Sequence, residues 1–283
     1  MMETTTLYIK TQSQQSKLKE LTEEALATLC QSLENGKSDE MIRYLEVMSR
    51  FPRYSFRNLL LILIQKPDAS RVMGYASWKR LGRQVKKDEK AIRIWAPMKT
   101  RVGEENRTAT DSPKEGNRES EETLIFRPVC VFDVSQTDGK ELPKLSDVAG
   151  EPGVYLERLK RFASDQGITL GYKDNLRAEG VSRCGEILLR SDLLPALEFH
   201  VLSHEIAHEL IHKREMRHEL SKRQAETEAE AVAYVVSKSI GLHTGNASSD
   251  YIQLWNGNKE AVSHSLSAIR RTAALITLAL LDA

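Results

Sequence analysis

Cysteines and long apolar runs are both scarce in this chain of 283 residues. The three cysteines, Cys30, Cys130 and Cys184, have no spacing typical of a metal site, so we expect reduced thiols buried in the core. No apolar run reaches the roughly eighteen residues of a membrane span, and no signal peptide is recognisable. These absences indicate a cytoplasmic protein with no membrane partner. The formal net charge is only +1, so a polyanion-binding surface would require local concentration of charge.

Apolar periodicity and turn-forming residues predict a mixture of helices and strands. Helices are expected at residues 15–33, 39–48, 56–65, 154–166 and 261–281. Strands are expected at residues 90–95, 123–134, 169–172 and 186–190. The polar, acidic residues 103–122 are expected to be a mobile insertion between paired strands. The mixture of predicted helices and strands indicates an α+β fold. The chain is long enough for two hydrophobic cores, so we expect two domains, residues 1–145 and residues 151–283.

Positive charge is concentrated between residues 50 and 101. This segment holds fourteen Lys and Arg residues against three acidic ones, a net charge of about +11. Neutralising a phosphate releases counterions, so such a segment suits a polyanion. Aromatic residues, among them Tyr54 and Trp78, are interleaved with the charges and can stack on unpaired bases, which favours single-stranded DNA. The alternative is a solvated basic face over an ordinary core.

The sequence His-Glu-Ile-Ala-His at residues 204–208 is the strongest motif in the chain. Residues four apart share one face of a helix, so His204 and His208 can hold one Zn²⁺ ion. Glu205 lies beside them, where it can take a proton from a water molecule as the general base of a metallopeptidase. A half-buried helix is predicted around the motif, with Asp192 as its N-cap and Pro195 in its first turn.

The neighbours of this motif need separate interpretations. Glu209 follows the second histidine and is expected to point to solvent. His200 and His212 extend the ladder at four-residue spacing. A helix face offers only two adjacent turns to one ion, so we expect these two to support the ligands or to lie at the surface. The strand at residues 187–189 is expected to be a sheet edge that holds a peptide backbone across the metal.

A third protein ligand is expected from the next helix, which carries Glu226, Glu228 and Glu230. Glu226 and Glu230 share a face, whereas Glu228 lies on the opposite flank of the apolar stripe, and periodicity leaves the choice open. The helix pair resembles that of gluzincin metallopeptidases, in which a Glu ligand is followed four residues later by a residue that orients a zinc-bound histidine. This resemblance implies Glu226 as the ligand, ahead of Glu228, and Glu230 as the orienting carboxylate.

The chain also resembles antirestriction proteins of the ArdC type. The likeness is carried by residues 54–62 (YSFRNLLLI), 74–87 (GYASWKRLGRQVKK) and 129–139, and by the His-Glu-x-x-His helix that follows them. It implies a single-stranded-DNA-binding domain followed by a metallopeptidase-like domain that holds one Zn²⁺ per chain. The DNA contacts are expected from Arg53, Tyr54, Arg57, Asn58, Trp78, Lys79, Arg80, Arg83, Lys86 and Lys87.

We therefore expect an antirestriction-type protein that binds single-stranded DNA and hydrolyses a protein or peptide that the sequence does not identify. Its zinc site would be His204, His208 and Glu226, with Glu205 as the catalytic base. Two alternatives stay open. One is a DNA-binding module whose zinc site is not proteolytic. The other is a metallopeptidase that cleaves a phage repressor or a stress-response regulator, which residues 209–211 after the second histidine favour.

Overall fold

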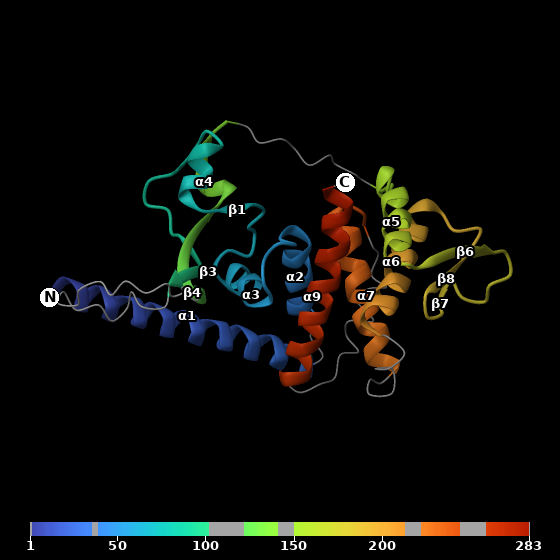
Figure 1. The fold of residues 1–283 in the computed structure, drawn as a ribbon, viewed down its shortest axis with the longest axis horizontal. Helices are drawn as coiled ribbons and strands as arrows, with labels where there is room; N and C mark the ends of the chain where they lie inside the picture. The colour runs from blue at the N-terminus through green and yellow to red at the C-terminus, as the bar shows by residue number, and fades with distance from the viewer. Residues whose placement is uncertain are drawn as a thin grey trace, which may run out of the picture.

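The computed structural model describes residues 2–35, 39–101, 122–140, 150–212, 222–243 and 259–282. A central group of helices separates two groups of strands that lie at opposite sides of the molecule (Figure 1). This mixture of helices and small sheets agrees with the predicted α+β class. None of the helices in the described segments combines the length and hydropathy that a membrane span requires.

Three helices open the chain: α1 (Met2–Glu34), α2 (Asp39–Arg50) and α3 (Phe56–Gln65). Helix α3 has the predicted bounds, because the Ser55 side chain accepts a hydrogen bond from the Asn58 amide at its start and Pro67 follows its end. Helix α1 begins thirteen residues earlier than predicted. Residues 2–14 contain no glycine or proline that would stop it.

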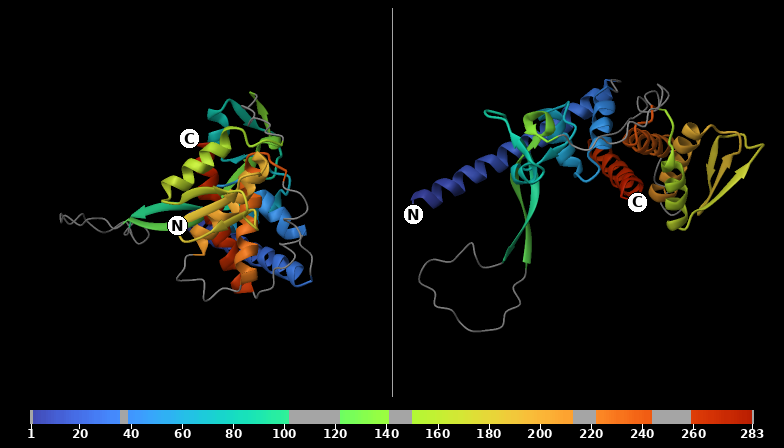
Figure 2. Two further views of the ribbon diagram at one scale, coloured as in Figure 1. Left: turned by 90° about the vertical axis from the view of Figure 1, so that its right-hand side faces the viewer. Right: turned by 90° about the horizontal axis from the view of Figure 1, so that it is seen from above.

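The N-terminal strands form two antiparallel sheets. The first has the order β1-β4-β3, and the second pairs β2 with β5. The bounds are β1 (Val72–Met73), α4 (Tyr75–Arg80), β2 (Arg83–Val85), β3 (Ile92–Arg101), β4 (Glu122–Asp133), the 3-10 helix η1 (Val134–Gln136) and β5 (Thr137–Gly139). Strands β3 and β4 form a long hairpin that projects from the helices (Figure 2). The predicted pairing on either side of the insertion is therefore confirmed, whereas residues 102–121 of that insertion lie outside the described residues.

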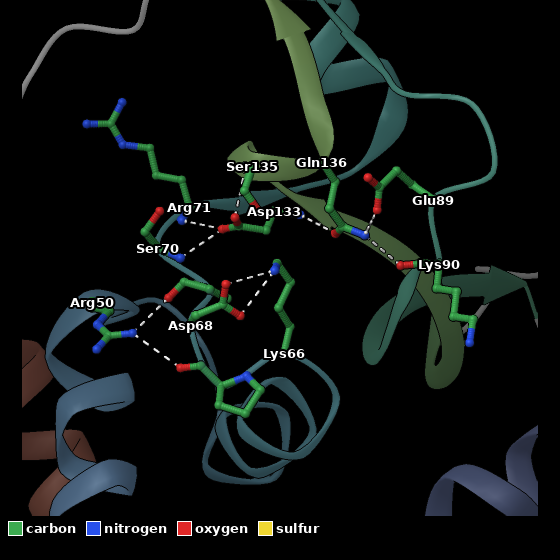
Figure 3. Close-up of polar contacts among 12 residues, drawn as sticks. Arg50, Lys66, Asp68, Ser70, Arg71, Glu89, Lys90, Asp133, Ser135 and Gln136 are labelled. Carbon is green, nitrogen blue, oxygen red and sulfur yellow. Dashed lines mark hydrogen bonds and ion pairs between the residues drawn. The ribbon is translucent and has the colours of Figure 1, made fainter.

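A polar junction fixes the turn between α3 and β1 against the end of β4 (Figure 3). Asp133 Oδ1 accepts hydrogen bonds from the amides of Ser70 (2.8 Å) and Arg71 (2.9 Å), and its Oδ2 accepts one from Ser135 (2.9 Å). Burial would raise the pKa of Asp133, but these hydrogen bonds hold it below its ordinary value. The carboxylate is thus a buried structural acceptor, with only 1% of the residue exposed.

The second group of strands lies beside the helices of the C-terminal part. Their bounds are α5 (Val154–Asp165), β6 (Thr169–Lys173), β7 (Gly180–Ser182), β8 (Glu186–Arg190), α6 (Pro195–Ile211), α7 (Lys222–Ser239) and α9 (Lys259–Leu281). Strand β8 pairs in parallel with β6 and antiparallel with β7. The prediction that residues 187–189 form a sheet edge is wrong, because β8 has a partner on both sides and the edge strands are β6 and β7.

Helix α6 starts later than predicted. Its N-cap is Leu194, with Pro195 in the first turn, and not Asp192. The Asp192 carboxylate is engaged elsewhere, since it accepts a hydrogen bond from Arg190 at the end of β8. A proline in the first turn costs nothing because that position has no intrahelical acceptor for an N–H group.

The buried apolar side chains form one cluster that includes residues of α1, α2 and α3 as well as α6, α7 and α9. Helix α2 packs on α7, which joins the two parts of the chain. The division into domains at residues 145 and 151 stays a prediction. The prediction of buried cysteines is right for Cys30 only. Cys130 and Cys184 are exposed, because they lie on a projecting hairpin and in the turn before β8.

Candidate functional site

Helices α6 and α7 pack against one another and bring three potential metal ligands together. His204 and His208 lie one turn apart on α6, with their Nε2 atoms separated by 3.1 Å. Glu226 faces them from the first turns of α7, with its Oε2 atom 3.4 Å from His204 Nε2 and 3.6 Å from His208 Nε2. The three residues predicted as ligands therefore lie close together in the structure, although they come from two different helices.

The spacing of these three atoms fits a metal ion. Ligands about 2.0–2.1 Å from a tetrahedral centre are separated by about 3.3 Å, close to the three distances observed. His204, His208 and Glu226 form the one group of three such donors found among the described residues. Two imidazoles and a carboxylate are a donor set that zinc and several other first-row divalent ions accept.

The short contacts within this triad shift the pKa values of His204 and Glu226. Burial would lower the pKa of His204, but hydrogen bonds to Glu226 and Glu230 raise it to about 9. Hydrogen bonds to His204 and His208 hold the pKa of Glu226 well below its ordinary value. The Glu226 carboxylate therefore ties α7 to the two histidines of α6.

Glu205 lies beside the triad and is nearly buried, with 8% of the residue exposed. Burial raises the pKa of its carboxyl, whereas the charges of His204 and His208 and a hydrogen bond from the Ser182 backbone act in the opposite direction. Its side chain rests against Gly180 of β7. Glu205 is therefore a partly desolvated carboxylate held between α6 and the sheet edge, as a general base requires.

A further carboxylate, that of Glu230, contacts His204 and His200. Glu230 Oε2 lies 3.2 Å from His204 Nδ1, and its Oε1 lies 3.2 Å from His200 Nε2. His200 also contacts Ser237 through its Nδ1 atom at 3.3 Å. This geometry agrees with the role that the gluzincin resemblance implied for Glu230, and it gives His200 a supporting place outside the triad.

Glu228, the second choice for the third ligand, faces away from the triad and contacts His212. Its Oε2 atom lies 2.9 Å from His212 Nε2, and His212 Nδ1 lies 3.1 Å from His208 Nδ1. Both side chains are buried. The four-residue spacing of the histidines in the sequence indicated that His212 lies near the ligands. Its contact with Glu228 depends on how α7 packs on α6, which the periodicity of the sequence does not predict.

Glu209 does not point to solvent, so that prediction is wrong. Its carboxylate accepts hydrogen bonds from the Ser182 hydroxyl and from the Gly185 amide (2.7 Å). It therefore ties α6 to the β7–β8 turn on the side of the helix away from α7. The charge is accommodated because both oxygens have donors.

A cavity of about 550 Å³ opens in front of the triad. Strand β7 forms one wall of it through Gly180, Val181 and Ser182, and the start of α7 forms another through Ala225 and Glu226. In the described part of the chain β7 pairs with β8 alone. The cavity thus combines the triad, Glu205 and an edge strand in one place.

The predicted DNA contacts fall into three groups in the structure: exposed, buried, and partly buried with bonds inside the fold. Exposed side chains are those of Arg53, Arg57, Lys79, Arg80, Lys86 and Lys87. Two others are corrected to structural roles. Trp78 is fully buried and donates its indole N–H to the Phe132 carbonyl (2.9 Å). Asn58 is buried, with its amide bonded to both the N–H and the carbonyl of Trp95 (2.8 Å each).

Several remaining members of the predicted set are bonded within the fold. Arg83 donates to the Thr137 hydroxyl and carbonyl, both at 2.8 Å, and so ties β2 to β5. Tyr54 is partly buried and donates to the Val72 carbonyl (3.1 Å). Arg53 pairs with Asp282 at 3.0 Å, but both side chains are mostly exposed, so this pair is weak and open to exchange. Lys79, Arg80 and Lys87 are exposed, the first two on α4 and the third just after β2.

Comparison with known proteins bears on the N-terminal sequence and on the fold of most of the chain. Residues 15–132 match the family described as the N-terminal domain of anti-restriction factor ArdC. The fold is similar over 93% of this chain to crystal structures of the antirestriction ArdC protein from R388 plasmid. The metal-free form gives a TM-score of 0.54 and the Mn(II)-bound form 0.52, each at 17% identity with 98% of that protein covered.

A protein of Bacillus anthracis described as "Uncharacterized protein pXO2-81" is 23% identical over 269 residues, which is 82% of this chain. The chain spans about half the length of that relative, 46%. The N-terminal sequence and the fold are thus each similar to those of ArdC. The matched residues 15–132 include residues 54–87, which carry the resemblance to ArdC-type proteins in the sequence.

Proposed function

We propose that this protein binds single-stranded DNA through the exposed cations of its N-terminal part and carries a metal-dependent peptidase site between α6 and α7. The observation that carries the second half of the proposal is the convergence of His204 Nε2, His208 Nε2 and Glu226 Oε2, with Glu205 beside them. The ArdC-type sequence and the basic segment support the first half.

His204, His208 and Glu226 would hold one divalent ion. Bound there, the ion would supply Lewis acidity that polarises a peptide carbonyl and acidifies a water molecule. Zinc is the ion that the motif predicts, and the same donors suit manganese, the metal named for the R388 ArdC structure. Glu230 would keep the His204 ring in the orientation that directs Nε2 to the ion.

The residues around the triad would position a peptide and move its proton. Glu205 would take a proton from water and pass it to the leaving amine, a task that the raised pKa of a desolvated carboxyl favours. Strand β7 would pair with an extended peptide at its outer edge, because it lies along the same cavity. The substrate class is therefore an extended segment of a protein or an unfolded peptide.

The DNA-binding half would act on DNA that enters the cell as a single strand. Basic side chains on α4 and the β2 region would cover its backbone and keep other enzymes away, as the antirestriction resemblance implies. The peptidase half would act on a protein met at the same place.

The decisive experiment substitutes Glu205→Gln and measures protection of incoming plasmid DNA from a restriction enzyme in cells. Metal content and single-strand affinity are measured on the purified protein. Loss of protection with both binding properties retained would support peptide hydrolysis as the activity. Unchanged protection would show that the protein works by DNA binding, with a non-proteolytic metal site. Glu157→Gln on α5, where Glu157 pairs with Lys160 at the surface, is the matched control.

A further inference from the structure

We propose that His212 is a positioning residue for the metal ligand His208, and that Glu228 fixes the tautomers of both rings. The inference rests on the proposed metal site, and it assigns roles to two residues that the ligand triad does not use. It begins from an unusual contact: the Nδ1 atoms of two histidines, on the same helix and four residues apart, lie 3.1 Å from each other.

The chemistry of coordination sets the direction of each proton along this path. A histidine that gives its Nε2 lone pair to a cation is neutral and carries its proton on Nδ1. His208 Nδ1 therefore donates, and His212 Nδ1 accepts. His212 must then carry its own proton on Nε2, which lies 2.9 Å from Glu228 Oε2. The contacts of His208, His212 and Glu228 thus accommodate the arrangement of protons that metal binding by His208 demands.

Glu228 is held so that it can only accept at this position. Its other oxygen, Oε1, accepts hydrogen bonds from Ser265 of α9 and from Gln224 (3.1 Å) of α7. An ionised carboxylate has no donor, so it forces the Nε2–H tautomer on His212. Because both side chains are almost fully buried, water offers no ready replacement for either contact.

The two metal-binding histidines are thus supported differently. His204 reaches a carboxylate of α7 directly, through Glu230. His208 reaches one through His212, and that path ends on α9 at Ser265. Supporting groups of this kind orient a ligand ring and raise its basicity, and their loss weakens metal binding by about 10- to 100-fold.

The test measures the affinity of the full-length, metal-free protein for Zn²⁺ and for Mn²⁺ by competition with a chelator. His212→Ala should weaken binding of both ions by about 10- to 100-fold. His212→Asn should recover part of this loss, because its side-chain oxygen can take the place of Nδ1 as the acceptor for His208. His243→Ala, which removes an exposed histidine beyond the end of α7, is the control and should bind as the wild type does.

The outcomes separate this inference from the proposed function. Wild-type affinity in His212→Ala would overturn the positioning role and leave the metal site intact. A wild-type protein that binds neither ion would overturn both. Circular dichroism on each variant checks that the fold persists.

The tautomers provide a test without any substitution. In the zinc-loaded wild-type protein, ¹H–¹⁵N spectra of the histidine rings should show His208 protonated at Nδ1 and His212 protonated at Nε2. A His212 ring protonated at Nδ1 would overturn the proposal, because that ring could not accept from His208.

Discussion

Gly180 of β7 lies directly against Glu205 of α6. A methyl group at Gly180 would come within 2.9 Å of the Glu205 Oε1 atom and within 2.7 Å of Val201 Cγ1. The missing side chain therefore lets the edge strand approach the helix that carries the candidate general base. A side chain at position 180 would therefore displace Glu205 or the strand.

Gly180→Ala should destabilise the protein and displace either β7 or Glu205. Val201 is buried in the core, so the added methyl group meets side chains with little room to move. Overpacking of this kind costs about 1–3 kcal/mol, which thermal unfolding monitored by circular dichroism would detect.

Gly74→Ala is the matched control for that substitution. Gly74 has no atom within 4 Å of the position of an added Cβ, and its φ of −67° suits any residue. Because Gly74 is the N-cap of α4, where alanine is less favourable than glycine, the substitution should cost about 0.5 kcal/mol. Equal stability of Gly180→Ala and Gly74→Ala would show that β7 does not hold Glu205 as described.

Asp133 should make the stability of the protein depend on acidic pH. Its pKa is lower in the folded state than in the unfolded state, so its contribution is fully present above the unfolded value, about 4, and is lost as pH falls through the folded value. Asp133→Asn places an amide donor against an amide N–H and should cost about 1–3 kcal/mol at neutral pH.

Urea unfolding of wild type and Asp133→Asn between pH 7 and pH 3 checks this expectation. The gap between the two proteins should shrink as the medium becomes acidic. Asp68→Asn is the control, because Asp68 pairs with Lys66 at the surface and should change stability little (Figure 3). A gap that stays constant down to pH 3 would argue against an ionised Asp133.

Replacing Lys79, Arg80 and Lys87 together by alanine should weaken single-stranded DNA binding and flatten its dependence on salt. If each contacts one phosphate, the slope of log affinity against log salt should fall by about 2, since each contact in a single strand contributes about 0.7. Fluorescence anisotropy with a labelled oligonucleotide at several salt concentrations measures both quantities.

A variant with the same loss of charge elsewhere separates local contacts from net charge. Arg161 on α5, Lys173 at the end of β6 and Arg177 are exposed. Figure 1 shows α5 and β6 across the central helices from α4. Their replacement should leave the salt slope unchanged. If both triple variants changed the salt slope equally, the DNA-binding surface would not be at α4.

The elements that the sequence predicts well are those with strong local signals. Helix α3 has a serine cap, a continuous apolar run and a following proline, and both of its ends are where these residues place them. Strand β8 was also predicted with its observed bounds, but not its place in the sheet. Whether a short apolar strand is central or at an edge depends on its neighbours, and the neighbour β7 has only three residues.

In the candidate site too, features with local sequence signals were predicted and features that depend on distant residues were not. The spacing of His204 and His208 alone predicts that they share a helix face, and the structure brings Glu226 to them. The interpretation of Glu209 failed because its partner, the turn after β7, is distant in sequence. Trp78 and Asn58 are buried, so the prediction that they contact DNA is wrong. Tryptophan and asparagine side chains occur both in protein cores and at DNA interfaces, and the sequence alone does not distinguish the two.

The central claim is that α6 and α7 together build one metal site, and its most direct test is a count of bound metal. Elemental mass spectrometry on purified wild type, His208→Ala and Glu226→Ala should find about one divalent ion per chain in the wild type and a large loss in both variants. Single-strand affinity, measured on the same samples, should remain unchanged. A wild-type chain without metal, or a Glu226→Ala variant that keeps its ion, would contradict the claim.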